Sequence, residues 1–169
     1  MRLFIALNCN TEQKYFQSLQ KQFPLEKLTF PKEFHITLKF LGEVSEEKKD
    51  EIIDLLEKIK NSLFTIKTGE IEEFNKRVII LKIVSDETIL LQKNIDEILR
   101  KIFPKEIRFQ AHVTLARIKS LTNEKAFFER IKKIKTEVKD ISINSLQLIE
   151  STLTPQGSEY KIVYEKKFQ

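Results

Sequence analysis

The chain has 169 residues, of which 41% are hydrophobic and 33% are charged, and this balance excludes an intrinsically disordered protein. The length predicts one large domain or two small lobes with a sizeable core. A net charge of +5, from 30 basic and 25 acidic residues, is compatible with a polyanionic partner such as nucleic acid but is too modest to require one.

The chain begins with an apolar stretch that predicts a β-strand over residues 2–8. This stretch is too short for a secretory signal, and no other segment approaches the length that spans a membrane. Cys9, which follows it, is the only cysteine, so an intramolecular disulfide and a CxxC metal site are both excluded. We therefore expect a cytoplasmic protein without membrane contact, and we expect a monomer.

The first half of the chain predicts alternating strands and helices. Asn10 and Gln13 have the spacing of a capping box for a helix that ends before Pro24, and Ser45 is placed to cap a second helix. In chain order, the elements expected after the first strand are the helix between residues 10 and 24 with Phe16, Leu19 and Phe23 inward, strands over 28–30 and 34–41, a helix over 46–60 with Ile52, Leu55, Leu56 and Ile59 inward, and a strand over 63–68.

The second half repeats this order. Ser85 is placed to cap a helix that Pro104 closes, and Thr122 to open another. The expected elements are a strand within 77–84, a helix over 86–102, a strand within 109–117, a helix over 123–134, a long strand over 137–150 and, after a turn at 155–157, a last strand over 159–168. The spacing from Leu3 to His35 nearly equals that from Val78 to His112, which indicates a diverged duplication.

The only two histidines of the chain occupy the same pattern in the two halves. The two copies read His35-Ile36-Thr37-Leu38 and His112-Val113-Thr114-Leu115. Because side chains alternate between the faces of a strand, each histidine shares a face with its threonine. In the first copy, alternation leaves Lys39 on the histidine face and directs toward the core the apolar residues Phe34, Ile36, Leu38 and Phe40.

Paired imidazoles favour proton-transfer chemistry. Histidine gains or loses a proton near neutral pH, so one imidazole can act as base and the other as acid, and a threonine hydroxyl can donate to an anion between them. Catalytic zinc usually takes three protein ligands, and the sequence has no cluster of histidine or cysteine. The pattern therefore predicts phosphate ester chemistry with no metal and no cofactor. Taken singly, either histidine would be interpreted as an ordinary strand residue, and threonine favours strands in any case.

With both motifs in view, the chain resembles the 2H phosphoesterase superfamily and, within it, the RNA 2′,3′-cyclic phosphodiesterases, also called the 2′-5′ RNA ligase family. The resemblance covers nearly the whole chain. Beside the paired His-x-Thr-x motif it rests on the segments 1–7, 34–44, 74–84, 112–117 and 148–153, with Gly157 and Tyr160. Two departures occur: Ala111 stands where a proline commonly precedes the second histidine, and Asn75 where the family often has a proline after phenylalanine.

The resemblance implies an α+β fold in one bilobal domain over residues 1–169, with two pseudo-twofold-related lobes of antiparallel sheet, helices outside and a central cleft. It implies hydrolysis of RNA 2′,3′-cyclic phosphodiester ends to 2′-phosphomonoesters, with the reverse 2′-5′ ligation open to the same site. It assigns His35 as proton donor and His112 as proton acceptor, with Thr37 and Thr114 binding the phosphate.

Arg117 matches an arginine that is common after the second motif of the family. Strict alternation places it on the face opposite His112, so it needs a bulge or the strand end to reach a substrate. A solvated arginine at the end of a strand is the alternative.

The expected substrates are RNA ends or small cyclic nucleotides. Two other functions stay open from the sequence. One is hydrolysis of a different cyclic phosphate, such as ADP-ribose 1″,2″-cyclic phosphate. The other is a noncatalytic RNA-binding module, for which a pair of proton-transfer groups would be unnecessary.

Overall fold

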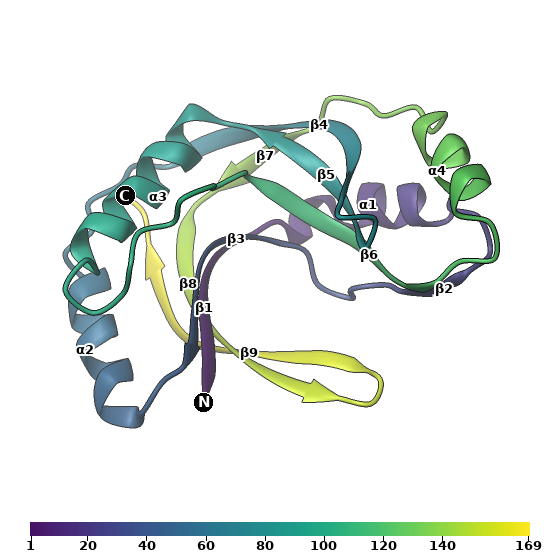
Figure 1. The fold of residues 1–169 in the computed structure, drawn as a ribbon. Helices are drawn as coiled ribbons and strands as arrows, with labels where there is room; N and C mark the ends of the chain where they lie inside the picture. Colours follow the sequence, from purple (N-terminus) through teal and green to yellow (C-terminus); the bar gives the residue numbers. More distant parts are fainter.

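Two antiparallel sheets form the framework of the computed structural model, which describes all 169 residues (Figure 1). One sheet has the strand order β3-β1-β8-β9 and the other β2-β6-β5-β4-β7. The strands are β1 (Arg2–Asn8), β2 (Lys27–Thr29), β3 (His35–Glu43), β4 (Phe64–Phe74), β5 (Val78–Val84), β6 (His112–Ser120), β7 (Asp140–Ile143), β8 (Ser145–Thr154) and β9 (Gly157–Lys167). The helices are the 3₁₀ helix η1 (Asn10–Glu12), α1 (Gln13–Gln20), α2 (Glu46–Leu56), α3 (Asp86–Ile98) and α4 (Glu124–Lys132).

The two histidine strands occupy equivalent places. β3 pairs antiparallel with β1 in the first sheet, as β6 pairs antiparallel with β5 in the second. β3 and β6 also lie next to each other where the two sheets meet. The predicted α+β fold with two related sheets is therefore confirmed, and the histidine strands are neighbours across the junction.

The lobes do not coincide with the two halves of the sequence. Helix α1, from the first half, packs against β6, and helix α3, from the second half, packs against β3 (Figure 1). One hydrophobic cluster of 33 buried residues includes side chains from both sheets and all four α-helices. Because the halves exchange elements over a continuous core, neither half buries its own apolar surface alone. No helix is both long and apolar enough to cross a bilayer.

Two of the predicted helix starts are confirmed. The hydroxyl of Ser45 accepts a hydrogen bond from the backbone N–H of Lys48 at 3.3 Å, and that of Ser85 accepts one from Thr88 at 3.0 Å. These caps satisfy N–H groups that have no partner within the first turn. Both helices end earlier than the apolar periodicity predicts, at Leu56 and Ile98.

The other two predicted starts are wrong. No side chain caps α1, because the Asn10 side chain instead accepts a hydrogen bond from the backbone N–H of Phe34 at 2.8 Å. Helix α4 is capped by Asn123, which accepts from Ala126 at 3.0 Å, whereas the Thr122 hydroxyl donates to Glu26. In both cases a partner distant in the sequence takes the side chain that the local pattern assigned to a cap.

The single strand predicted over 137–150 is also wrong, because the chain forms two strands there. β7 pairs with β4 in one sheet, and β8 pairs with β1 and β9 in the other, with Asn144 between them. Side chains of β7 alternate between exposed and buried, whereas the first five of β8 are all buried. The chain passes from one sheet to the other at this point, which the continuous β-propensity of the segment does not reveal.

Each histidine strand carries a β-bulge at the same place. Register shifts opposite Ile5 and Ala6 in β1, and opposite Ile79 and Ile80 in β5, leave Leu38 and Leu115 without partners. A bulge reverses the alternation of every side chain that follows it. The expected positions of Lys39 and Phe40 are therefore exchanged: Lys39 is buried in the core and Phe40 is 63% exposed.

Lys39 is held in the core by an ion pair. Its Nζ lies 2.5 Å from Asp96 of α3 and donates to the backbone carbonyl of Pro104 at 2.6 Å. Asp96 also accepts from Gln92 at 2.8 Å and from the backbone N–H of Glu106 at 3.0 Å. Burial opposes the charged carboxylate, but the contacts with Lys39, Gln92 and Glu106 lower its pKa overall. The network satisfies both charges and links β3 to the segment that leads into β6.

Candidate active site

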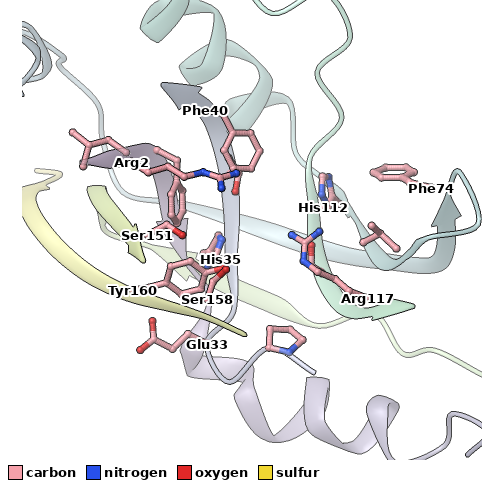
Figure 2. Close-up of a pocket in the computed structure, with 16 residues that line it drawn as sticks. Arg2, Glu33, His35, Phe40, Phe74, His112, Arg117, Ser151, Ser158 and Tyr160 are labelled. Atoms are coloured by element: carbon pink, nitrogen blue, oxygen red, sulfur yellow. The ribbon is translucent and has the colours of Figure 1, made fainter. Parts of the chain in front are cut away.

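Both histidines and both threonines line one cavity between the sheets (Figure 2). Its volume is about 250 Å³. The lining residues are Arg2, Leu3, Phe4, Pro31, Glu33, His35, Thr37, Phe40, Phe74, Val78, His112, Thr114, Arg117, Ser151, Ser158 and Tyr160. The structure thus brings together all five side chains that the sequence singled out, from two strands of different sheets.

The ring of His112 is oriented by its backbone neighbour. Its Nδ1 lies 2.7 Å from the carbonyl oxygen of Gln110, which can only accept a hydrogen bond, so Nδ1 carries the proton. The ring of Phe74 packs edge-on against it, with centroids 5.0 Å apart. In the neutral imidazole, Nε2 therefore keeps a free lone pair, as a general base requires.

Phe74 is placed by an unusual turn. Asn75 and Lys76, which follow it, have φ angles of 51° and 55°, in the left-handed region that asparagine tolerates better than most residues. Proline is fixed near −65°, so a proline at position 75 would not fit this turn. Asn75 thus suits the turn that this chain forms, and the contact between Phe74 and His112 is kept.

His35 is enclosed by aromatic rings. Phe4 lies 5.0 Å from it and Tyr160 5.2 Å, the latter edge-on. Burial lowers the pKa of His35 to about 4, with further lowering by the positive charges of Arg117 and His112. Burial also lowers the pKa of His112, with Arg117 adding to the effect, although its hydrogen bond to Gln110 opposes it. Both imidazoles are therefore neutral near pH 7 in the free protein.

Arg117 reaches the cavity because of the bulge at Leu115. The reversed alternation places its side chain on the same side of β6 as His112, and Figure 2 shows its guanidinium turned toward that ring. The protein contains twelve ion pairs, and neither Arg117 nor Arg2, which enters the cavity from β1, takes part in any of them. Two arginines without carboxylate partners make the cavity attractive to an anion.

Several lining residues were not identified from the sequence. Among them are Arg2, Phe4, Glu33, Phe40, Phe74, Ser151, Ser158 and Tyr160. Alternation along β1 separates Arg2 and Phe4 from the core positions Leu3 and Ile5, and this was an available signal. No local signal distinguishes Phe40, because the bulge that exposes it depends on pairing with β1. No group of three or more side chains with metal-binding atoms is close enough to hold an ion.

The chain matches the model of the LigT-like phosphoesterase family twice, over residues 7–80 and 81–160. The fold and its paired histidines are those of a 2H phosphoesterase, and the chain belongs to the LigT-like family of that superfamily. It is 35% identical to the RNA 2′,3′-cyclic phosphodiesterase of Methanocaldococcus jannaschii, covering 98% of this chain and 99% of that one. A similar enzyme of Thermotoga maritima is 29% identical over 100% of this chain and 96% of its own.

Solved structures agree on the fold. A protein of Thermus thermophilus superposes with a TM-score of 0.84 at 20% identity, covering 99% of this chain and 98% of that one. Escherichia coli LigT, in a crystal structure with 3′-AMP, gives a TM-score of 0.78 at 21% identity, with 99% and 97% covered. At these identities the likeness supports the architecture, and the curated relatives support the family.

Proposed function

We propose that this protein hydrolyses RNA 2′,3′-cyclic phosphodiester ends to 2′-phosphomonoesters. The observation that carries the proposal is the convergence of two imidazoles, two threonine hydroxyls and two arginines without ion-pair partners in one cavity. Curated relatives at 29–37% identity are named RNA 2′,3′-cyclic phosphodiesterases, and they match most or all of the chain. The chemistry of the cavity and the similarity to these relatives both support hydrolysis of a 2′,3′-cyclic phosphodiester.

The reaction is an in-line attack of water on the cyclic phosphorus. Neutral His112 takes a proton from the water through Nε2, the new P–O bond forms, and the bond from phosphorus to the ribose 3′ oxygen breaks. His35, as imidazolium, gives its proton to that oxygen, which leaves as a hydroxyl. Attack on the cyclic ester adds one water, and the phosphate stays on the 2′ oxygen.

Protonation of His35 is coupled to substrate binding. Free His35 is neutral near pH 7 because burial and Arg117 disfavour its charge. A phosphodiester anion between the imidazoles adds a negative charge that offsets Arg117, so it raises the pKa of His35. The acid therefore gains its proton when the substrate is in place.

The remaining polar groups stabilise charge on the nonbridging oxygens. Thr37 and Thr114 each share a strand face with a histidine and line the same cavity. Their hydroxyls can donate to those oxygens while Arg117 and Arg2 supply positive charge. Removal of one such donor typically lowers the rate about 10²- to 10³-fold.

Phe40 provides a surface for the base of the terminal nucleotide. Its ring is 63% exposed although it lies on the cavity wall, where an aromatic ring would otherwise be costly to leave in water. Base stacking on an aromatic side chain stabilises a complex by about 1–3 kcal/mol and tolerates every base. Phe40→Leu is therefore expected to raise KM for a cyclic mononucleotide with a smaller effect on kcat.

We also propose that residues 1–169 act as one bilobal domain, as a monomer and in the cytoplasm. The exchange of α1 and α3 between lobes and the continuous core support a single domain. A lone, buried cysteine, whose thiol pKa burial raises to about 12, is in keeping with a reducing compartment. Light scattering coupled to size exclusion tests the monomer directly.

The first test is incubation with an oligoribonucleotide that ends in a 2′,3′-cyclic phosphate, in the presence of EDTA. We expect a 2′-phosphate end, and we expect His35→Ala and His112→Ala each to lower kcat by at least about 10²-fold, the scale of a positioned acid or base. A Gln13→Ala variant on α1 serves as a purification control. Retention of most activity by both histidine variants would contradict the mechanism.

Competition with ADP-ribose 1″,2″-cyclic phosphate at equal concentration defines the substrate class. Preferential turnover of that compound would indicate that the substrate is a cyclic phosphate other than an RNA end. Binding of the RNA end without turnover at any pH would indicate a noncatalytic RNA-binding module.

A further inference from the structure

A second cavity adjoins the catalytic cavity. We call it the side groove; it has a volume of about 620 Å³ and lies between residues 29–33, Arg117 and Lys119 of β6, and the hairpin of β8 and β9. It shares with the catalytic cavity the residues Pro31, Glu33, Arg117, Ser158 and Tyr160. These shared walls place the two cavities directly beside each other.

The side groove carries cations that are not neutralised within the protein. Lys32, Arg117 and Lys119 line it, all three are exposed, and none takes part in an ion pair. Two carboxylates, Glu33 and Glu159, also line the groove, but no lysine or arginine nitrogen lies within 4.0 Å of either. Unneutralised cations beside a phosphodiester site are suited to a second phosphate.

Apolar surface accompanies these charges. Phe30 is 45% exposed and Leu153 is 68% exposed, and both line the side groove. Proteins that bind single-stranded nucleic acid combine a basic groove for the backbone with aromatic or apolar surface for the bases. The side groove has both components within a short distance of the catalytic histidines.

We propose that the side groove binds the nucleotide that precedes the cyclic end, with Lys32 and Lys119 at the phosphate that joins it to the terminal nucleotide. This inference rests on the proposed function. The catalytic cavity, at about 250 Å³, has room for little more than the terminal nucleotide. The preferred substrate is therefore an RNA strand of at least two nucleotides rather than a free cyclic mononucleotide.

The direction of the strand follows from the two ends of the catalytic cavity. Phe40 and Glu33 lie at opposite ends of it in Figure 2, and Glu33 is at the end that opens into the side groove. In a nucleotide, the base and the 5′ chain leave the ribose from different carbons on either side of the ring oxygen. With the terminal base on Phe40, the 5′ chain is directed toward Glu33 and the side groove.

A cavity beyond Phe40 is a weaker candidate for this nucleotide. It is lined by Lys39, Phe40 and residues 103–108, and Phe40 is its only residue in common with the catalytic cavity. Of its cations, Lys39 is buried on Asp96, and Lys105 lies 3.2 Å from Glu97. Only Arg108 there lacks an ion pair, so the charge available to a phosphate is smaller than in the side groove.

The test compares two substrates on three proteins. The substrates are adenosine 2′,3′-cyclic phosphate and an adenosine hexanucleotide that ends in a 2′,3′-cyclic phosphate. The proteins are the wild type, the double variant Lys32→Ala with Lys119→Ala, and a control double variant, Lys93→Ala with Lys101→Ala. Lys93 and Lys101 are also exposed and free of ion pairs, but they line neither cavity, so the control removes the same charge elsewhere.

The quantity measured is the ratio of kcat/KM for the hexanucleotide to kcat/KM for the mononucleotide. We expect the ratio to fall about tenfold in the Lys32 and Lys119 variant, the scale of one charge-assisted hydrogen bond, and to stay within about twofold of wild type in the control. An unchanged ratio, or an equal fall in the control, would contradict the proposal that the side groove binds the preceding nucleotide. Failure of wild type to turn over either substrate overturns the proposed function instead.

If wild type turns over neither substrate, a binding measurement still tests the side groove. The affinity for a 5′-fluorescein hexanucleotide ending in a 2′-phosphate is measured by fluorescence anisotropy on the same three proteins. We expect the Lys32 and Lys119 variant to bind about tenfold more weakly than the control, with a salt slope lower by about 0.7 for each phosphate that the variant no longer neutralises. Equal dissociation constants for the two double variants would refute the assignment.

Discussion

At the scale of the residue, Arg117 has two opposing effects on the active site. Its charge favours an anion in the cavity, as the proposed function requires, and it lowers the pKa of both His35 and His112. The productive state has one imidazole charged and one neutral, and both pKa values lie below the ordinary 6.5. We therefore expect kcat/KM for the cyclic mononucleotide to follow a bell-shaped profile whose alkaline limb lies below about pH 6.5.

Replacement of Arg117 separates its two effects. Arg117→Gln removes a positive charge beside each imidazole, so both pKa values rise and the alkaline limb moves to higher pH. We expect kcat/KM at the optimum to fall about 10²-fold at the same time, since the variant lacks a group that stabilises the phosphate. The pH profile of Lys93→Gln, which removes a charge from the outer surface, should match wild type. A slower Arg117→Gln enzyme with an unmoved limb would show that the arginine does not set these pKa values.

At the scale of the element, the ion pair of Lys39 and Asp96 fixes strand β3 against helix α3. Lys39→Met leaves the Asp96 carboxylate buried without its cation, and we expect the free energy of unfolding to fall by about 3–5 kcal/mol. Urea denaturation followed by circular dichroism measures this. Addition of Asp96→Leu to Lys39→Met should restore much of the stability, because an apolar pair carries no unpaired charge.

An exposed ion pair supplies the matched control. Lys67 and Asp140 join β4 to β7 at 2.7 Å, but both side chains are well exposed. Lys67→Met should change the free energy of unfolding little or not at all, because water screens such pairs. If Lys39→Met cost no more than Lys67→Met, the buried network would not be what holds β3 in place.

At the scale of the whole molecule, closure of the two sheets over the cavity makes stability depend on pH. The sheets partly bury His35 and His112 in their neutral forms, with the pKa of His35 lowered to about 4. In the unfolded chain both imidazoles titrate near 6.5, so below that pH the unfolded state binds more protons and stability falls as pH falls. Well above pH 6.5, from about pH 8, neither state is protonated, and this contribution is constant.

Urea denaturation between pH 6.5 and 5 measures the effect while most carboxylates remain ionised. We expect stability to decline with a slope of up to about 1.4 kcal/mol per pH unit for each histidine. The double variant His35→Gln with His112→Gln should show a flatter dependence. Equal slopes for the variant and wild type would mean that the cavity does not disfavour the charged imidazoles.

Much of the secondary structure, and the core of the site, could be predicted from the sequence. Strands β1, β3, β5 and β6, the caps Ser45 and Ser85, and the shared face of each histidine with its threonine all depend on neighbours along the chain. Local sterics and alternation fix such features wherever the segment ends up in space. The family resemblance added the orientation of the two halves, which composition and periodicity do not contain.

Most of the features that sequence reasoning missed depend on partners far along the chain. Asn10 binds the backbone of Phe34 instead of capping a helix, and the strand predicted over 137–150 divides between two sheets. The exchange of Lys39 and Phe40 follows from a bulge set by pairing with β1, and the matching bulge brings Arg117 to His112.

By itself, therefore, the sequence determined which chemical groups the protein presents and that each histidine shares a strand face with its threonine. Only the tertiary structure decided what surrounds them: the aromatic rings that enclose His35, the arginines that line the cavity, and the side groove that adjoins it. The physical reason is that strand alternation is a local property of the backbone, whereas burial, bulges and charge environments arise from contacts between segments distant in the chain.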